Sequence, residues 1–340
     1  MPAADPRTST VARVLAALRE AGERGVSGER LAGELSLSRA AVWKAIASLR
    51  DDGCRIDAVS GHGYRLVSVA DRLRSELVTP WLTTSRLGRL VRCYDTVEST
   101  MDAAAERARA GDPEGLVIVA ESQTAGRGRR GRTWHSPTGL NLYFSVLLRP
   151  RVAPHELGPV TLVVGVALAR AVHELAGLRP LIKWPNDLYF GASKVAGILT
   201  ELSAEMDRVH HVVVGVGLNV NGSPSDFSAE LEGRATSLAI ECGGTPLDRA
   251  RLLATFLNHL EPAYDRFLAA GLEPFLAEIE AASAVRGCRV TVDLGRRRVE
   301  GVAGSVAPDG ALAIDLADGS RIDLHSGEII SFAAERVPPC

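Results

Sequence analysis

Lysine is almost absent from this sequence. Only three of the 39 Lys and Arg residues are lysines: Lys44, Lys183 and Lys194. The simplest explanation for the general preference for arginine is a biased base composition of the genome. The exceptions call for another reason, because lysine offers a compact point charge on a flexible stem whereas arginine offers a planar fork. The three lysines are therefore the first candidates for functional cations.

Cysteine is also scarce, and the five cysteines are scattered without a CxxC pair: Cys54, Cys93, Cys242, Cys288 and Cys340. This pattern argues against a disulfide framework or a structural zinc site and favours a reducing, cytoplasmic setting. His210 and His211 are neighbours. On an expected strand they point to opposite faces, so they make a poor pair of metal ligands.

Long apolar runs and an excess of positive charge are missing as well. No run reaches the roughly 18 apolar residues of a membrane span. The polar start of the chain, Met1–Thr10, lacks the apolar segment of a secretory signal. We therefore expect a cytoplasmic protein without a membrane partner. The net charge of −2 excludes nucleic-acid binding by the whole surface, so any DNA contact needs a local patch.

What is present divides into three folded parts, as expected for 340 residues. The patterns predict an α+β protein with a winged helix-turn-helix domain (1–69), a linker (70–86), a central mixed-sheet α/β domain (87–283) and a C-terminal part of short strands (284–340). A family resemblance, given below with the residues that carry it, implies that this last part is a small SH3-like β-barrel. The last part contains four short strands separated by Gly and Asp turns: Arg289–Leu294, Arg298–Val306, Ala311–Leu316 and Arg321–Leu324.

The first part has the signals of three helices followed by a hairpin. A helix is expected over Thr10–Ala21, a second after the cap residue Ser27, and a third after the cap residue Ser38. Two strands and their turn follow as a wing: Arg55–Val59, Tyr64–Val67 and 60–63. A third helix of this kind can enter the major groove of DNA.

The faces of the third helix differ in chemistry. Val42, Ile46 and Leu49 share one face and are expected to pack inward. The residues expected to face DNA lie outside that stripe: Ser38, Arg39, Ala40, Trp43 and Lys44. The alternative is a small helical domain that binds protein, because residues 1–69 carry only a slight positive excess. Helix-turn-helix plus wing favours DNA.

The central part contains a segment with four arginines and three glycines in seven residues, 126–132 (GRGRRGR), called the basic loop from here on. Glycines let the backbone approach a ligand closely, and guanidinium groups bind anions as forks. The loop satisfies GxGxxG and nearly matches a P-loop. Both patterns need a helix at the loop, but the Pro- and Gly-containing segment 133–139 follows. We therefore predict an anion-binding loop of another kind; the alternative is a solvated basic loop.

Two further segments contain the remaining lysines. The run 183–187 (KWPND) follows a short apolar strand and ends in a turn, where Lys183 supplies a cation, Asn186 an amide and Asp187 a carboxylate suited to Mg²⁺. The alternative is an ordinary strand and turn. Lys194 begins a strand that pairs naturally with His211–Leu218 as a hairpin. A surface lysine is the alternative there.

A hydroxyl pair marks the start of another helix. Ser99 or Thr100 is expected to cap a helix that runs to about Ala110. A hydroxyl pair at a helix N-terminus also suits a neutral polar group of a ligand.

These segments, in this order, resemble the biotin–protein ligases. The resemblance rests on Ser99-Thr100, on Gln123 with the basic loop and Trp134, on KWPND, and on Lys194 with 196–199 (AGIL). With the N-terminal winged helix, nearly the full length is similar to the bifunctional biotin ligases that also repress the biotin operon. The family usually has Asn where Met101 stands here, which puts one ligand contact in doubt.

The resemblance implies a reaction and a set of site residues. Biotin and MgATP would give biotinyl-5′-adenylate, and a lysine of a biotin carboxyl-carrier protein would accept the biotinyl group. The implied biotin-binding residues are Ser99, Thr100, Met101, Gln123, Arg127, Gly128, Arg129, Lys194 and Gly197. The implied ATP-binding residues are Arg130, Arg132, Trp134, Lys183, Asn186 and Asn219, with Lys194, Arg129 and Lys183 catalytic and Asp187 near Mg²⁺.

The resemblance also implies partners and leaves two competing interpretations. The partners would be operator DNA and, with adenylate bound, a second copy of the chain. One competing interpretation is a regulator that senses biotin or its adenylate without ligating, which the complete basic loop and both lysines of the central part disfavour. The other is a nicotinamide-dependent oxidoreductase, suggested by GxGxxG alone and disfavoured by the missing helix.

Overall fold

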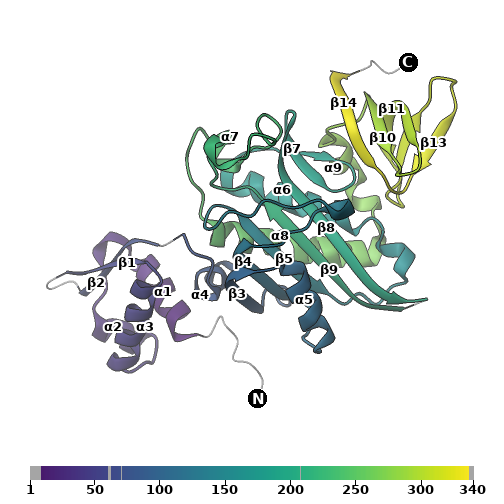
Figure 1. Cartoon of the computed structure of the whole chain (residues 1–340). Helices are drawn as coiled ribbons and strands as arrows, with labels where there is room; N and C mark the ends of the chain where they lie inside the picture. Colours follow the sequence, from purple (N-terminus) through teal and green to yellow (C-terminus); the bar gives the residue numbers. More distant parts are fainter. Residues whose placement is uncertain (1–8, 60–62, 70, 207, 337–340) are drawn as a thin grey trace.

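The computed structural model describes residues 9–59, 63–69, 71–206 and 208–336. Figure 1 shows three parts in chain order: an N-terminal lobe, a central domain built on a large sheet, and a small C-terminal sheet at the opposite end from the lobe. This arrangement confirms the expected α+β fold with its winged helix-turn-helix and mixed sheet.

The N-terminal lobe forms as its capping signals predict. Its elements are α1 (Thr10–Ala21), α2 (Gly28–Glu34), α3 (Arg39–Asp51), β1 (Arg55–Val59) and β2 (Gly63–Ser68), with a 3₁₀ turn at Gly22–Arg24. The Oγ atoms of Ser27 and Ser38 accept backbone N–H groups at the starts of α2 and α3, which satisfies donors that a helix end otherwise leaves unpaired. The wing strands pair antiparallel, and the expected turn at 60–62 lies outside the described residues.

The stretch expected to be a linker is folded and packed. It contains α4 (Ser75–Val78) and a 3₁₀ turn, Thr79–Trp81, and both pack against α1 on one side and the central helix α8 (Arg249–Ala270) on the other. Leu73, Leu77 and Val78 are buried. This connector, residues 71–87, therefore joins the lobe to the central domain through a core rather than through open chain.

The central sheet has seven strands in the order β3-β4-β5-β9-β8-β7-β6. Only β3 and β4 are parallel, so the sheet is mixed as predicted. The expected hairpin that begins at Lys194 is confirmed, with Ala196 opposite Leu218. The strands are β3 (Leu90–Val97), β4 (Leu116–Gln123), β5 (Leu142–Leu148), β6 (Leu181–Lys183), β7 (Asp187–Phe190), β8 (Ser193–Glu205) and β9 (Arg208–Leu218).

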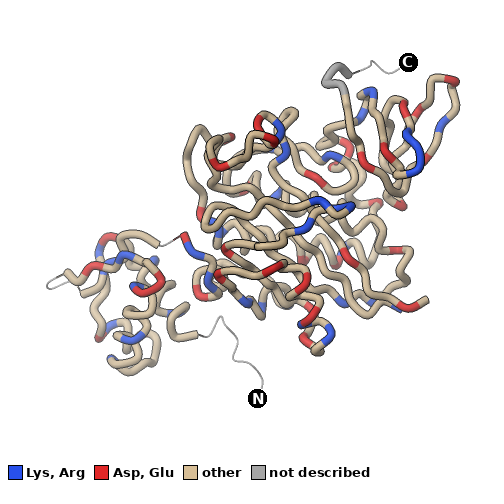
Figure 2. The backbone as a smooth tube through the Cα atoms, viewed as in Figure 1, with Lys and Arg blue, Asp and Glu red and all other residues tan. Residues whose placement is uncertain are grey.

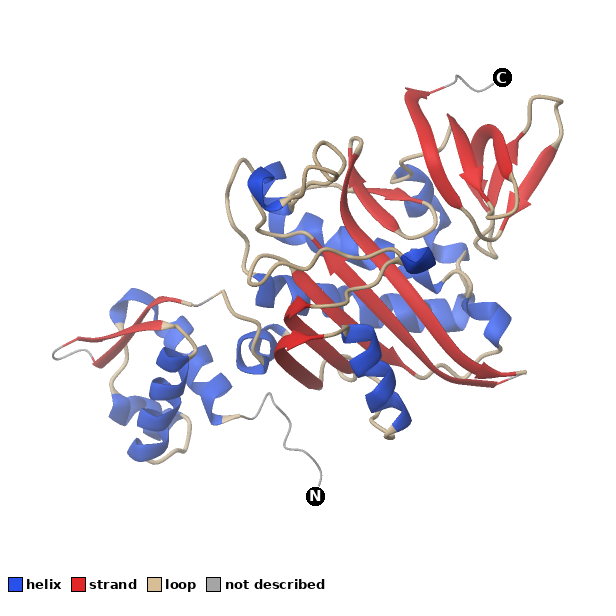
Figure 3. Cartoon of the chain, viewed as in Figure 1, coloured by secondary structure: helices blue, strands red, loops and turns tan. Residues whose placement is uncertain are grey.

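Helices cover the two faces of this sheet unequally. Figure 3 shows the long helices α6 (Val160–Ala176) and α8 behind the strands and α5 (Thr100–Arg109) in front. Successive residues of β4 point into two hydrophobic cores on opposite faces of the sheet. Val117 belongs to the core on the side of α6 and α8, and Ile118 belongs to the core on the side of α5. The front face is only partly covered, which leaves room for a site. Two short helices and four 3₁₀ turns complete the described part of the domain: α7 (Leu238–Glu241), α9 (Leu276–Ala281), and turns at Arg129–Gly131, Pro154–Leu157, Pro224–Asp226 and Glu273–Phe275.

The segment Pro154–Ala176 is long and apolar enough to cross a membrane by length and composition. The sequence contains no unbroken apolar run of that length, so this segment was not expected to pass such a test. In the structure 61% of its most apolar window is buried, and α6 packs along α8 and against the sheet. The burial and packing of this segment are those of a core helix of the central domain.

The C-terminal part is a five-stranded antiparallel sheet in the order β13-β12-β11-β10-β14. The four expected strands form, and a fifth, β14, was missed although Ile329, Ile330 and Phe332 are residues that strands favour. The strands are β10 (Cys288–Asp293), β11 (Arg298–Val306), β12 (Leu312–Asp315), β13 (Arg321–Leu324) and β14 (Glu328–Arg336).

Candidate functional site

A pocket opens on the front face of the central sheet and encloses about 460 Å³ of empty space, its open mouth included. Strand β9, the start of β8, the N-terminus of α5 and the basic loop all contribute to it. Figure 2 shows Lys and Arg positions crossing the centre of the molecule there. The lining residues are Ser99, Thr100, Met101, Gln123, Arg127, Gly128, Arg129, Trp134, Asn186, Lys194, Gly197, Ile198, Leu199, Gly215, Val216 and Gly217.

The floor of the pocket is bare backbone. Gly197 of β8 and Gly217 of β9 are paired across the hairpin, and the indole of Trp134 lies over both. A Cβ at Gly197 would come within 2.9 Å of the ring, and one at Gly217 would meet it more closely still. Gly215 makes room in the same way for the side chain of Met101. Glycine is required at these positions because a flat group lies directly on the sheet.

A hydrogen-bonded polar wall stands beside this floor. Ser99 caps α5, as predicted, by accepting the Met101 N–H. Thr100 donates its N–H and its hydroxyl to Gln123 Oε1 at 2.9 and 3.2 Å. Gln123 Nε2 donates to Ser136 Oγ, and Ser145 Oγ donates to Thr100 Oγ1. These hydrogen bonds fix the side chains of the wall relative to one another.

The basic loop folds over the mouth. Arg127 contacts carboxylates on both sides, Asp102 at 2.7 Å and Glu201 at 3.3 Å. Arg129 Nη1 donates to Asn186 Oδ1 at 3.0 Å, so the loop touches the KWPND turn. Arg130 sits at φ 56°, the left-handed region that non-glycine residues rarely occupy. The loop contains a short 3₁₀ turn, Arg129–Gly131, and a longer helix does not follow it, as expected.

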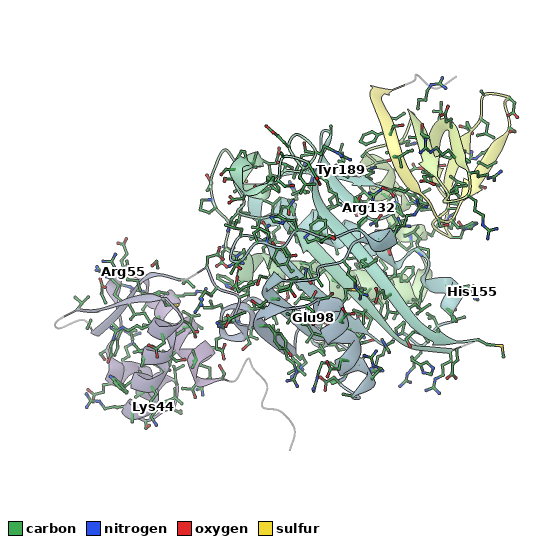
Figure 4. The ribbon with its side chains drawn as sticks, in the orientation of Figure 1. Lys44, Arg55, Glu98, Arg132, His155 and Tyr189 are labelled. Carbon is green, nitrogen blue, oxygen red and sulfur yellow. The ribbon has the colours of Figure 1, made fainter. Side chains whose placement is uncertain are left out.

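The outer half of the loop reaches the C-terminal sheet. Arg130 lies 3.5 Å from a carboxylate oxygen of Asp293, and both Arg130 and Arg132 pair with Glu328. Arg129 also donates to the Gly327 carbonyl. Figure 4 shows Arg132 on the side of the central domain that faces that sheet. The sequence alone left open whether Glu328 approaches the site or is exposed, and its ion pairs with Arg130 and Arg132 bring it to the edge of the site.

The two lysines of the central part take different positions. Lys194 Nζ lies 2.7 Å from Asp187 Oδ1 and 5.3 Å from the centre of the Trp134 ring. Lys183 Nζ lies over two rings, Tyr189 at 4.9 Å and Phe332 of the C-terminal sheet at 5.4 Å. The lysines and the basic loop thus converge on one region, which the sequence analysis required.

Burial shapes the charge of the site. It lowers the pKa of the Lys183 ammonium, against which the nearby Asp187 carboxylate acts in the opposite direction. Burial also lowers the pKa of the Arg129 guanidinium, which stays charged at any physiological pH. Positive groups held away from water attract anions more strongly than exposed ones do, so the site suits a ligand with acidic groups.

The residues around Asp187 do not fit a metal ion held by the protein alone. The carboxylate already pairs with Lys194, and no group of three His, Cys, Asp or Glu side chains suited to a metal exists in the described part of the chain. A hard cation such as Mg²⁺ needs several oxygen ligands, which a nucleotide's phosphates commonly supply. We therefore derive no step through a resident metal.

All nine residues expected to hold biotin line the pocket, together with Trp134 and Asn186 from the expected nucleotide set. The others lie outside its lining. Arg130, Arg132 and Lys183 face the C-terminal sheet, whereas Asn219 is buried and donates to the Thr236 carbonyl. The floor glycines Gly215 and Gly217 were missed, although the alternation of Val and Gly along β9 was a usable signal.

The N-terminal lobe presents a second surface. Arg39, Ala40, Trp43 and Lys44 are exposed, and the Trp43 side chain is 62% exposed; Ser38 caps the helix that carries them. A groove lies between this face of α3 and the wing, and Figure 4 places Lys44 on the lobe away from the central domain. The lining residues are Gly28, Arg39, Ala40, Val42, Trp43, Ala58, Val59, Gly63 and Tyr64.

Comparison with known proteins matches both regions. The "Biotin/lipoate A/B protein ligase family" model matches residues 94–219, and an "HTH domain" model matches residues 10–65. The "Bifunctional ligase/repressor BirA" of Bacillus subtilis is 35% identical over 91% of this chain and 95% of its own length. The protein of the same name from Escherichia coli is 33% identical over 97% of this chain and its full length.

A solved structure agrees with these relatives. "Biotin protein ligase from Aquifex aeolicus in complex with biotin and ATP" superposes with a TM-score of 0.61 at 31% identity, covering 72% of this chain and 97% of that one. A relative spanning nearly the whole chain at this identity settles the family. With its helix-turn-helix lobe, its glycine-floored pocket and its basic loop, this chain belongs to the bifunctional biotin–protein ligase and repressor family.

Proposed function

We propose that this chain activates biotin with ATP, transfers the biotinyl group to a lysine of a biotin carboxyl-carrier protein, and represses biotin-synthesis genes by binding operator DNA. The observation that carries the catalytic part is the convergence of the basic loop and Lys194 on a pocket with a flat glycine floor. The helix-turn-helix lobe and the relatives named above support the repressor part.

The chemistry needs two anions close together. The biotin carboxylate attacks the α-phosphate of ATP, the bond from that phosphorus to the bridging oxygen breaks, and pyrophosphate leaves. Charge grows on the transferring phosphate and on the leaving group, so preorganised cations lower the barrier without any nucleophile from the enzyme. Lys194 and Arg129 line the pocket and are assigned this role; Lys183 is assigned the outer, nucleotide side.

The remaining lining residues bind and orient. Ser99, Thr100 and Gln123 offer hydroxyl and amide groups for the uncharged polar end of biotin. Trp134 offers an aromatic face to the adenine, and the nucleotide's Mg²⁺ enters as part of that substrate. The adenylate is a mixed anhydride that water destroys, so a loop over the mouth protects it until the acceptor amine attacks its carbonyl carbon and releases AMP.

The setting follows from the partners. Both proposed partners, a carrier protein and operator DNA, are cytoplasmic in a bacterium, and this supports a cytoplasmic location for the chain. Adenylate would favour a homodimer that reads a two-fold operator, because ordering of loops at a shared surface stabilises the pair. Equal sedimentation with and without biotin plus ATP would contradict the dimer.

One assay tests the catalytic proposal. The full chain is incubated with biotin, MgATP and a carboxyl-carrier domain, and the mass of the carrier is measured. A mass increase equal to one biotinyl group, dependent on ATP, is the expected result. An unchanged carrier, with biotin and ATP still bound by the chain, would instead support a sensor without ligase activity.

A further inference from the structure

Arg249 is a fully buried arginine at the first position of α8. A cation at a helix N-terminus faces the positive end of the helix dipole, and burying a charge is costly unless it is paired and hydrogen-bonded. Neither the fold of α8 nor the pocket needs a cation there. Its partners therefore indicate its role.

Those partners come from the connector and from the central sheet. Arg249 Nε donates to Asp71 Oδ1 at 2.9 Å and its Nη2 donates to the Asp71 carbonyl at 2.6 Å. Its Nη1 donates to Glu121 Oε2 at 2.8 Å and to the Asn141 carbonyl at 3.0 Å. Glu121 closes the cluster by accepting the backbone N–H of Leu73 at 2.6 Å. One guanidinium thus ties the start of the connector to β4 and β5.

Strand β4 connects this cluster with the pocket, because it carries both Glu121 and the pocket residue Gln123. Gln123 lies two residues further along β4, on the same side of the strand, and accepts from Thr100 on the pocket wall. It also donates to Ser136, whose hydroxyl donates to the carbonyl of Trp134. Two sets of hydrogen bonds, joined by the backbone of β4 between Glu121 and Gln123, therefore connect Asp71 with the residue that lies on the pocket floor.

Asn141 leads to the same segment from the other end. Its Nδ2 donates to the Tyr143 hydroxyl, which donates to the Pro137 carbonyl just beyond Trp134. The segment just after Trp134 is thus held at Ser136 by Gln123 of β4 and at Pro137 by Tyr143, which contacts Asn141.

In the other direction the connector leads to the DNA-binding lobe. Trp81 lies between two guanidinium groups, Arg19 of α1 at 4.6 Å and Arg251 of α8 at 4.8 Å. Arg74 lies 3.5 Å from Asp52 at the end of α3 and 2.9 Å from Asp95 of β3. These contacts fix the lobe to the connector and the connector to the central domain.

We propose that Asp71 and Arg249 are positioning residues that couple the ligand pocket to the orientation of the DNA-binding lobe within one chain. A ligand that moves Trp134 and Gln123 shifts Glu121 and Asn141, and through Arg249 it shifts the connector on which α1 and α3 rest. The inference rests on the proposed function and adds to it a route inside the chain, separate from any contact between two copies.

The test measures coupling rather than activity. DNA affinity of the full chain is measured without and with biotin plus MgATP, on a duplex selected from a random-sequence library with the wild-type chain and both ligands. Asp71→Asn keeps the size of the side chain but removes the charge that faces Arg249. We expect the ratio of the two affinities to fall by about fivefold or more, within the usual range of coupling, while labelling of the carrier domain continues at the wild-type rate.

A second variant acts at the other end of the route. Arg19→Met keeps an apolar stem against Trp81 but removes the cation, and we expect the same loss of coupling. Asp323→Asn is the matched control, since it removes a carboxylate from an exposed strand of the C-terminal sheet, and its coupling ratio should equal the wild-type value. Thermal melting of each variant establishes folding, so that a misfolded Asp71→Asn leaves Arg19→Met to decide.

Coupling has a reciprocal readout that a purely structural role would not change. DNA must alter the equilibrium affinity of the wild-type chain for adenylate by the same factor by which adenylate alters DNA affinity, and both variants should lose this effect. Folded variants with wild-type ratios overturn the inference. A wild-type chain that labels the carrier without any DNA response also overturns it, whereas failure of wild-type labelling overturns the ligase proposal instead.

Discussion

The floor and the roof of the pocket are built in different ways. The floor is buried β-hairpin backbone, with glycines where the indole of Trp134 lies. The roof is a loop whose arginines pair with half-exposed carboxylates such as Asp102 and Glu201. Exposed ion pairs contribute only about 0–1 kcal/mol each. The floor therefore keeps its shape without ligand, whereas the roof can exchange carboxylates for the anionic groups of a substrate at little cost.

The comparison also separates the cations by their surroundings. Lys194 starts a floor strand, and Lys183 is held between rings of two domains. The loop arginines lie on a segment with two residues in the left-handed region, Arg130 and Gly131. Changes to the floor should thus affect binding and chemistry, and changes to the roof should affect retention of the intermediate.

The largest effect is expected at Lys194. Lys194→Ala removes the floor cation and should slow adenylate formation about 10²–10³-fold, the usual loss for one preorganised group that stabilises transition-state charge. Pyrophosphate release measures the rate. Lys44→Ala is the matched control, because it removes the exposed lysine of α3 and should leave the rate unchanged. Normal turnover by Lys194→Ala would overturn its assignment.

A methyl group on the floor should have the next largest effect. Gly217→Ala places a Cβ against the Trp134 ring, and overpacking of this kind should displace the ring and raise the KM for ATP about tenfold. Gly33→Ala on α2 meets no atom within 4 Å and serves as control. Unchanged KM values with a folded protein would mean that the floor is as adaptable as the roof, and the comparison would fail.

A change in the roof should be milder and of another kind. Arg129→Gly removes a guanidinium that contacts Asn186, so the adenylate should leave the enzyme about fivefold faster, as for loss of one ordinary hydrogen bond. Rapid filtration of the radiolabelled intermediate measures its release. Because Arg129 is also assigned a share of the charge stabilisation, a slower first half-reaction is expected as well. Release at the wild-type rate would contradict its role in retention.

The smallest effect is a shift in a pH profile. Because burial lowers the pKa of Lys183, its ammonium is lost at a lower pH than that of an ordinary lysine. Adenylate formation should therefore decline on the alkaline side earlier in the wild-type chain than in Lys183→Arg, since arginine stays charged. Each profile is normalised to its own maximum. Parallel profiles would show that this charge does not limit the reaction.

Local signals in the sequence were enough for much of this structure. Ser27, Ser38 and Ser99 cap helices as predicted, because capping depends on neighbours within one turn. The hairpin at Lys194 follows from alternation along two strands. The nearness of the basic loop to both lysines was anticipated from chemistry, since separated cations could not serve one anionic ligand.

Contacts between distant residues could not be predicted in this way. Glu328 and Phe332 meet the site from the C-terminal sheet, and Arg249 pairs with Glu121 and Asp71 across more than a hundred residues of chain. No spacing or periodicity encodes such pairs. The packed connector was missed for the same reason, because its short helix is stabilised by burial against other elements rather than by its own propensity.

The scarcity of lysine has a consequence for an enzyme that makes a mixed anhydride. Such a compound acylates any unprotonated amine that it meets, and the molecule nearest to an escaping adenylate is the enzyme itself. In this chain Lys183 and Lys194 are partly buried at the site, so Lys44 is the one exposed side-chain amine in the sequence. Guanidinium groups stay protonated and poorly nucleophilic. A surface whose cations are arginines therefore does not react with escaped adenylate, which is left to acylate the acceptor lysine or to be hydrolysed by water.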